Sequence, residues 1–466
     1  MYDELDDKLH EECGVFGIFN FSDAANISYF ALHTLQHRGQ DAAGIVSSDG
    51  EQLYVHKDIG LVKEVFNKSS LSKCVGTSAI GHVRYATSGG GGMENVQPFS
   101  FKHSGGDFAL CHNGNIVNSQ ALRLQLEKTS SIFQSTSDSE ILAHLIKKDH
   151  RQNRIDAIKE ALLLLEGAFS FLVLTKDKLY AMRDRQGLRP LSLGKLGDGY
   201  VVSSETCAFD VIGAIFIRDI EPGEIVTISK DGVSSTFYAR EMSNKLCAME
   251  YIYFARPDSN LEGVNVHSSR KLCGSVLAKE APIDADIVIG VPDSSLSAAS
   301  GYAEASGIPY EMGLIKNRYT DRTFIQPSQE LRELGVKMKL SPVRSVVQGK
   351  RVVVIDDSIV RGTTSKQIIT MLKDMGAKEV HMRIASPPIT SPCFYGVATS
   401  TYDELISAFL DIEELREMIG ADSLAFLSIE GLKKSLGAKD LCLSCFDGKY
   451  PTYLYDQLEN TKKPSK

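Results

Sequence analysis

The chain has 466 residues, 43% of them apolar, and a formal net charge of -8 at pH 7. This length exceeds what one hydrophobic core usually serves, so two domains are expected. The acidic balance argues against general nucleic-acid binding, because neutralising phosphates requires a basic face. The first twelve residues have no signal-peptide pattern, and no later apolar run reaches the roughly 20 residues of a membrane span. We therefore expect a cytoplasmic protein without a membrane segment.

Cys13 stands where an acidic leader, residues 1–12, meets the apolar run CGVFGI. Nine cysteines in a chain without a secretory signal favour reduced thiols, metal ligation or catalysis over disulfides. A thiol is a modest nucleophile at pH 7, but a neighbouring amine can accept its proton. The amine of Cys13 itself is free only if the Glu12–Cys13 bond is cut, so residues 1–12 are predicted to be a propeptide. The alternative is an inert buried cysteine.

Up to about residue 240, short apolar runs alternate with Gly, Asn and Asp clusters, as in GVFGIFNF, DFALCHNGNIV and FSFLVLTKDKL. This pattern predicts short strands joined by turns, arranged as stacked antiparallel sheets. A helical pattern interrupts them at residues 139–148, where Ser and Asp residues that can cap a helix come first.

Five segments of this half resemble, in order, those of the class II glutamine amidotransferases: CGVFGI, LQHRGQDAAGI, GHVRYATSG, CHNGNI and STSDSE. This group belongs to the N-terminal nucleophile (Ntn) hydrolases, so the resemblance implies a four-layer αββα domain. It implies that Cys13 attacks the side-chain amide of glutamine and that Asn113 and Gly114 form the oxyanion hole. Arg84 would bind the carboxylate of glutamine, because a guanidinium fork matches a carboxylate, and Asp138 would pair with its ammonium group.

After about residue 245, uniformly apolar runs such as ADIVIGV, RVVVIDD and EVHMRIA alternate with helical stretches. This alternation indicates a parallel sheet covered on both faces. We place the domain boundary there, which gives domains of residues 13–245 and 246–466. Between Lys316 and Arg351 the chain has nine Lys or Arg and three acids. Such a basic stretch in an acidic protein suggests a small anionic ligand.

The string VVVIDDSIVRGTTS, residues 352–365, places two acids, a glycine and several hydroxyls directly after a buried strand. Backbone N–H groups and the positive end of the next helix attract a phosphate at such a point. Two adjacent carboxylates fit sugar hydroxyls or Mg²⁺. The alternative is an ordinary strand end followed by a capped helix. The chain lacks the P-loop pattern G-x-x-x-x-G-K-[ST], so a P-loop ATPase is not expected.

This string is similar to the phosphoribosyl-pyrophosphate (PRPP) motif of the type I phosphoribosyltransferases, which have an α/β fold with a parallel sheet. The resemblance implies that Asp356 and Asp357 hold the ribose hydroxyls and Mg²⁺, with Ser294 near the metal. The residues that would bind the 5-phosphate are Arg361, Gly362, Thr363, Thr364 and Ser365. Lys337 and Lys339 lie in a stretch that resembles the mobile loop of this family and would contact the pyrophosphate.

Cys442 and Cys445 form a C-x-x-C pair, and Cys247 and Cys393 lie in the same half. Four thiolates suit zinc or an iron–sulfur cluster, and spacing alone leaves both open. A class II glutaminase joined to a PRPP domain resembles the glutamine PRPP amidotransferases, over nearly the whole chain. The leader-bearing branch of that family carries a [4Fe-4S] cluster on four cysteines. The resemblance thus implies these four as ligands and leaves out Cys273.

The same resemblance implies a reaction. Ammonia from glutamine would be transferred to C1 of PRPP, giving 5-phosphoribosylamine, pyrophosphate and glutamate in the first committed step of purine synthesis. It also implies inhibition by purine nucleotides and a homotetramer. Two alternatives stay open: a class II amidotransferase with another acceptor, such as a sugar phosphate, and a PRPP-sensing regulator without catalysis.

Overall fold

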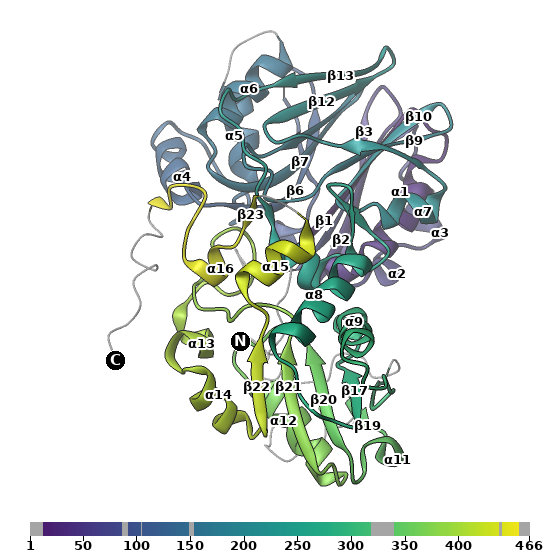
Figure 1. The fold of residues 1–466 in the computed structure, drawn as a ribbon. Helices are drawn as coiled ribbons and strands as arrows, with labels where there is room; N and C mark the ends of the chain where they lie inside the picture. The colour runs from purple at the N-terminus through teal and green to yellow at the C-terminus, as the bar shows by residue number, and fades with distance from the viewer. Residues whose placement is uncertain are drawn as a thin grey trace.

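The computed structural model describes residues 13–85, 92–103, 105–148, 153–317, 340–437 and 440–455. Two antiparallel sheets stack in the first half of the chain, and a parallel sheet forms the centre of the second half (Figure 1). Among the described residues, no helix combines the length and the apolar character that crossing a membrane requires.

The first sheet has seven strands, each antiparallel to its neighbours. In spatial order they are β11 (Ile215–Asp219), β9 (Ser192–Leu196), β10 (Gly199–Ser203), β1 (Cys13–Phe19), β4 (Ser78–Arg84), β2 (Ala42–Ser48) and β3 (Leu53–Ile59). Successive side chains of β1 point to opposite faces. Val15 and Phe19 lie in the core between the sheets, whereas Phe16 and Ile18 lie in the core under the outer helices. Both faces of this strand are therefore covered.

The second sheet has six antiparallel strands that face the first sheet. In spatial order they are β13 (Gly232–Phe237), β12 (Glu224–Ser229), β8 (Lys178–Arg183), β7 (Gly167–Thr175), β6 (Phe108–Ile116) and β5 (Phe99–Phe101). Ala109 and Cys111 of β6 lie in the core between the sheets, whereas Phe108 and Leu110 lie in the outer core.

Helices cover the outer face of each sheet, which completes an αββα sandwich. The seven-stranded sheet is covered by α1 (Ala24–Thr34), α2 (Val62–Val65) and α7 (Cys207–Ile212). The six-stranded sheet is covered by α4 (Ser119–Lys128), α5 (Glu140–Lys148) and α6 (Arg154–Leu164). The helix expected at residues 139–148 is thus α5, and the predicted fold of this half is confirmed.

The parallel sheet of the second half has the order β17 (Ile287–Gly290), β20 (Arg351–Asp356), β21 (Glu379–Ile384) and β22 (Ser423–Phe426). The helices α8 (Val266–Glu280), α9 (Leu296–Ser306) and α15 (Ile429–Leu436) pack on one face. The helices α12 (Thr363–Asp374) and α14 (Ile412–Ile419) pack on the other. The predicted α/β domain with a parallel sheet is confirmed.

The two halves share a hydrophobic core where they meet. Val117, Ala168 and Leu188 of the first half lie in the same core as Phe394 and Tyr395 of the second. Near this junction, β14 (Leu246–Cys247) pairs in parallel with β23 (Leu441–Cys442), so residues 441–442 lie beside the start of the second half.

Candidate active site

Cys13 opens β1 and lies directly opposite Arg84, the last residue of β4. Side chains opposite each other on antiparallel strands share a face. Cys13 is on the same side of β1 as Val15, and Arg84 is on the same side of β4 as Ile80, so both point between the two sheets. Both residues are buried, with exposures of 7% and 5%. The register thus places the two side chains next to each other on the same face of the sheet.

Asn113 and Gly114 lie on β6, which packs against β1 from the opposite sheet. Asn113 alternates with Ala109 and Cys111, so its side chain faces the space that Cys13 faces. Its amide is fully buried, and neither Oδ1 nor Nδ2 has a hydrogen-bond partner among the described residues. Gly114 has φ 133°, and a Cβ there would lie 2.1 Å from the carbonyl oxygen of Ala168, so only glycine fits.

Asp138 lies just before α5 and is bound to the end of β6. Its Oδ2 accepts a hydrogen bond from the N–H of Ile116 at 2.9 Å, and His112 Nδ1 lies 3.8 Å from its Oδ1. Burial raises the pKa of this carboxyl, but the interaction with His112 and the hydrogen bonds outweigh it, so the pKa of Asp138 is lowered from its ordinary value. Asp138 is therefore a carboxylate at neutral pH.

A buried ionic network, which the sequence did not indicate, contacts the backbone of Cys13. Arg38 Nε donates to the carbonyl oxygen of Cys13 at 3.1 Å. Arg38 also pairs with Glu205 at 2.6 Å and with Glu250 at 2.9 Å. Glu250 is in turn 3.2 Å from Arg189 Nη1. Arg38 lies in the motif segment LQHRGQDAAGI, and this was the only feature of the sequence that pointed to a functional role for it. Glu250 and Arg189 belong to none of the motif segments.

A second site lies at the carboxyl ends of β17 and β20, which are neighbours in the parallel sheet. Ser295 Oγ donates to Asp356 at 3.0 Å, and Ser294 Oγ donates to Asp357. Ser358 Oγ donates to the other oxygen of Asp357 at 2.7 Å. The loop after β17 and the loop after β20 thus bring together carboxylate and hydroxyl oxygens, which are the ligands that Mg²⁺ prefers.

The helix α12 begins directly after these acids, and Thr363, Thr364 and Ser365 form its first turn. Gly362 precedes it with φ 79°, in the left-handed region that favours glycine. The first N–H groups of a helix lack partners within it, so this turn can bind an anion. Arg361 is bound to Glu404, with Nη2 donating to Oε1 at 2.6 Å, a partner that the sequence did not indicate.

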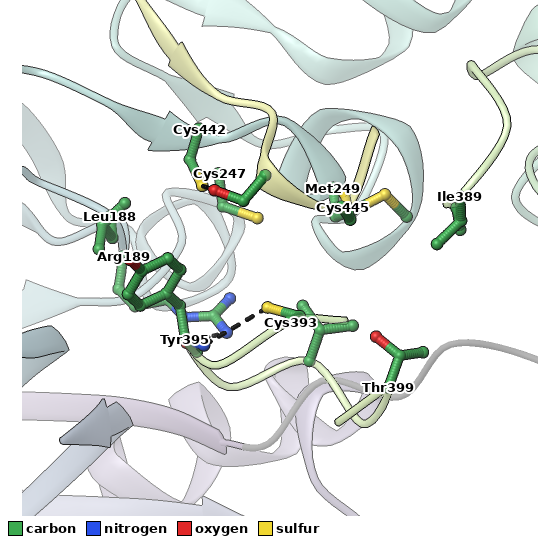
Figure 2. Close-up of a pocket in the computed structure, with 12 residues that line it drawn as sticks. Leu188, Arg189, Cys247, Met249, Ile389, Cys393, Tyr395, Thr399, Cys442 and Cys445 are labelled. Atoms are coloured by element: carbon green, nitrogen blue, oxygen red, sulfur yellow. Dashed lines mark hydrogen bonds between the residues drawn. The ribbon is translucent and has the colours of Figure 1, made fainter. Parts of the chain in front are cut away.

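Four cysteines from three parts of the second half line one cavity. Cys247 and Cys442 are direct partners in the β14–β23 pair, while Cys393 and Cys445 line the same cavity. Figure 2 shows these four side chains, with Arg189 from the first half, around it. Cys273 is not among the residues that line this cavity.

Burial raises the pKa of all four thiols, and neighbouring sulfurs raise it further at Cys247, Cys393 and Cys445. The pKa of Cys393 rises to about 11, and that of Cys445 rises well above 9.0 through burial and the closeness of the other three. Arg189 opposes this effect at Cys247, Cys393 and Cys442. In the described part of the chain, no three His, Cys, Asp or Glu side chains are arranged to hold a single metal ion.

Several predicted residues fall outside the described residues. They are the leader, residues 1–12, and the two lysines expected to contact pyrophosphate, Lys337 and Lys339. Their roles stay predictions, and so does the domain boundary near residue 245.

Comparison with known proteins covers almost the whole chain. Residues 82–211 match a glutamine amidotransferase domain, and residues 267–385 match a phosphoribosyl transferase domain. The amidophosphoribosyltransferase of Bacillus subtilis (strain 168) is 58% identical over 96% of this chain and 95% of its own. The chain belongs to the amidophosphoribosyltransferase family. The predicted family and activity are confirmed, and both alternatives, the sugar-phosphate acceptor and the non-catalytic regulator, are set aside.

Two solved structures share the fold of this chain over nearly its whole length. The glutamine PRPP amidotransferase of B. subtilis, complexed with ADP and GMP, has a TM-score of 0.92 at 57% identity and covers 95% of this chain and 98% of its own. A structure described as the allosteric regulatory enzyme of purine biosynthesis has a TM-score of 0.93, also at 57% identity, and covers 96% and 98%.

Proposed function

We propose that the chain hydrolyses glutamine at Cys13 and transfers the ammonia to C1 of PRPP, releasing pyrophosphate and forming 5-phosphoribosylamine. Its place is purine biosynthesis, the pathway named for one structural relative. One observation carries the residue assignment: Cys13, Arg84 and the unpartnered amide of Asn113 share the space between the two sheets. The amidophosphoribosyltransferase activity of the family is consistent with this residue assignment.

In the first reaction, the thiol of Cys13 gives its proton to its own α-amine and attacks the amide carbon of glutamine. The carbonyl oxygen becomes negatively charged and is bound by Asn113 Nδ2 and the N–H of Gly114, a contribution of about 3 kcal/mol per donor. Ammonia leaves when the intermediate collapses to a thioester, which water hydrolyses to glutamate. Arg84 and Asp138 bind the two charged ends of glutamine. This route requires removal of residues 1–12, because an amide nitrogen is no base.

In the second reaction, ammonia attacks C1 of the ribose and the C1–O bond to pyrophosphate breaks. The first turn of α12 binds the 5-phosphate through its N–H groups and the hydroxyls of Thr363, Thr364 and Ser365. Asp356 and Asp357 accept hydrogen bonds from the ribose hydroxyls. In this reaction Arg361 would add positive charge to the phosphate site. Its hydrogen bond to Glu404 holds the guanidinium group in one orientation.

The oxygen donors at the ends of β17 and β20 fit a hard divalent ion. Asp356, Asp357 and Ser294 would hold Mg²⁺, which, when bound, neutralises charge on the leaving pyrophosphate.

The four thiols around one cavity fit a [4Fe-4S] cluster, which takes one thiolate for each iron. Cys247, Cys393, Cys442 and Cys445 would therefore surround the group rather than converge on one point. We propose that the cluster joins the start of the second half to the end of the chain, since nothing in the reaction needs an electron carrier.

Purine nucleotides are proposed as inhibitors, supported by the ADP and GMP in a relative's structure. A homotetramer is part of the same proposal, and sedimentation analysis would check it.

The test compares two nitrogen donors in the Cys13→Ala variant. Pyrophosphate release from PRPP should disappear with glutamine and persist with ammonia, because the variant loses the nucleophile but keeps the PRPP site. Normal use of glutamine by this variant would refute the assignment. Mass spectrometry of the purified parent should find Cys13 as the first residue.

A further inference from the structure

The segment Cys393–Tyr395 carries a proposed cluster ligand and is held by two polar side chains of the glutaminase half. Asn115 Nδ2 donates to the carbonyl oxygen of Phe394 at 2.9 Å. Arg189 Nη2 donates to the carbonyl oxygen of Tyr395 at 2.8 Å. The N–H of Tyr395 in turn donates to Cys393 Sγ at 3.4 Å, so the segment is bound to its own ligand sulfur. These contacts join the cysteine cavity to the other half of the molecule.

The first contact acts on the strand that carries the oxyanion residues. Asn115 follows Asn113 by two residues on β6, and their partners on β7 are Ala168 and Ser170. Between them lies Gly114, which has no side chain to hold it and depends on its neighbours for orientation. Val117, just beyond, packs in the same core as Phe394. The position of Phe394 therefore affects the position of the end of β6.

The second contact leads to the backbone of the nucleophile. Arg189 binds Glu250, Glu250 binds Arg38, and Arg38 Nε donates to the carbonyl oxygen of Cys13. All three charged side chains are fully buried. Buried charges need their partners, because an uncompensated charge in the interior is strongly destabilising. These side chains consequently have few alternative arrangements, and a shift at Tyr395 is passed toward Cys13.

We infer that Asn115 and Arg189 are positioning residues for glutamine hydrolysis, through which the segment Cys393–Tyr395 sets the oxyanion strand and the nucleophile. The inference rests on the proposed roles of Cys13 and Asn113. Neither residue is assigned a contact with glutamine, so their loss acts on the bound intermediate and not on substrate affinity. The PRPP site lies on other loops and is unaffected.

The test uses the holoenzyme of Asn115→Leu, which keeps the side-chain size but removes the donor. The kcat with glutamine should fall by about 10- to 100-fold, as expected for a misplaced reacting group. The KM for glutamine, the rate with ammonia, the iron content and the visible absorbance should stay as in the parent. Asn115→Ala serves if the leucine variant does not fold, and the same split is expected.

Arg189→Lys tests the second contact. The single ammonium group of lysine cannot replace the planar guanidinium group, which binds both Glu250 and the carbonyl oxygen of Tyr395. Asn118→Leu is the matched control. Asn118 is buried nearby and makes two side-chain hydrogen bonds, to Leu164 and Glu166, both within its own half. The Asn118→Leu variant should leave the ratio of the rate with glutamine to the rate with ammonia unchanged.

Two outcomes would overturn the inference: an unchanged kcat with glutamine in the Asn115 and Arg189 variants, or an equal fall with both nitrogen donors. The proposed function would fail separately, through normal use of glutamine by Cys13→Ala.

Discussion

The Asn113→Ala substitution tests whether the buried amide on β6 is kept for catalysis. Its two polar atoms have no hydrogen-bond partner among the described residues, although the side chain is fully buried. A buried unpaired amide destabilises a folded protein, so in the resting enzyme this side chain is a liability. Its proposed benefit comes only when a charged oxygen forms on the substrate. The substitution should therefore lower activity without lowering stability.

Both magnitudes follow from this geometry. Loss of one oxyanion donor raises the barrier by about 3 kcal/mol, which corresponds to a fall in kcat of about 100-fold or more. Removing an unsatisfied amide recovers about 1–3 kcal/mol, while the gap left by the lost carboxamide costs at least about 1 kcal/mol. The free energy of unfolding should therefore be unchanged or larger by up to about 2 kcal/mol.

The assay measures pyrophosphate release with glutamine and with ammonia, together with the thermal midpoint of each protein. Asn118→Ala is the control for stability, because it breaks two hydrogen bonds of a buried amide and should lower the midpoint without changing the ratio of the two rates. If Asn113→Ala kept the parental kcat with glutamine, or lost as much stability as the control, the oxyanion role would be refuted.

Three further predictions concern other parts of the molecule. Burial lowers the pKa of His82 from 6.5 to about 3, so below pH 6.5 the unfolded chain binds a proton that the folded chain does not, and stability falls as the pH is lowered through this window. Urea unfolding at several pH values should show a shallower fall for His82→Gln, and an identical slope would contradict this. Asp357→Asn should reduce pyrophosphate release by at least about 10-fold with both nitrogen donors, unlike the Cys13 variant; a loss confined to glutamine would argue against a PRPP role. Cys445→Ser should lose iron and visible absorbance, whereas Cys273→Ser should keep both, and equal iron in the two variants would exclude the proposed ligand set.

Local chemistry made much of the second half predictable. A buried strand that ends in two acids, followed by glycine and hydroxyls, predicts a phosphate site from neighbouring residues alone; in the structure β20 ends at Asp356, and α12 begins directly after Gly362. The sequence could not show that Ser295 is hydrogen-bonded to Asp356 or that Glu404 is hydrogen-bonded to Arg361, because these partners come from other loops.

The face that Cys13 takes could not be read from the sequence. All seven residues of β1 are buried, because helices cover one side and a second sheet covers the other. A strand buried on both faces has no alternation of polar and apolar residues to show its orientation. Only the register with Arg84 and the packing against β6 show that the thiol points between the sheets.

The sequence by itself determined the order of the motifs, the class of each half and the residue types that carry the chemistry, because turns, strand ends and helix starts depend on near neighbours. Tertiary structure alone decided which distant groups meet. Arg38 and Glu250 are 212 positions apart, and the four cavity cysteines come from three separate segments. Buried charges and thiols meet only where packing excludes water, and that packing is a property of the whole chain.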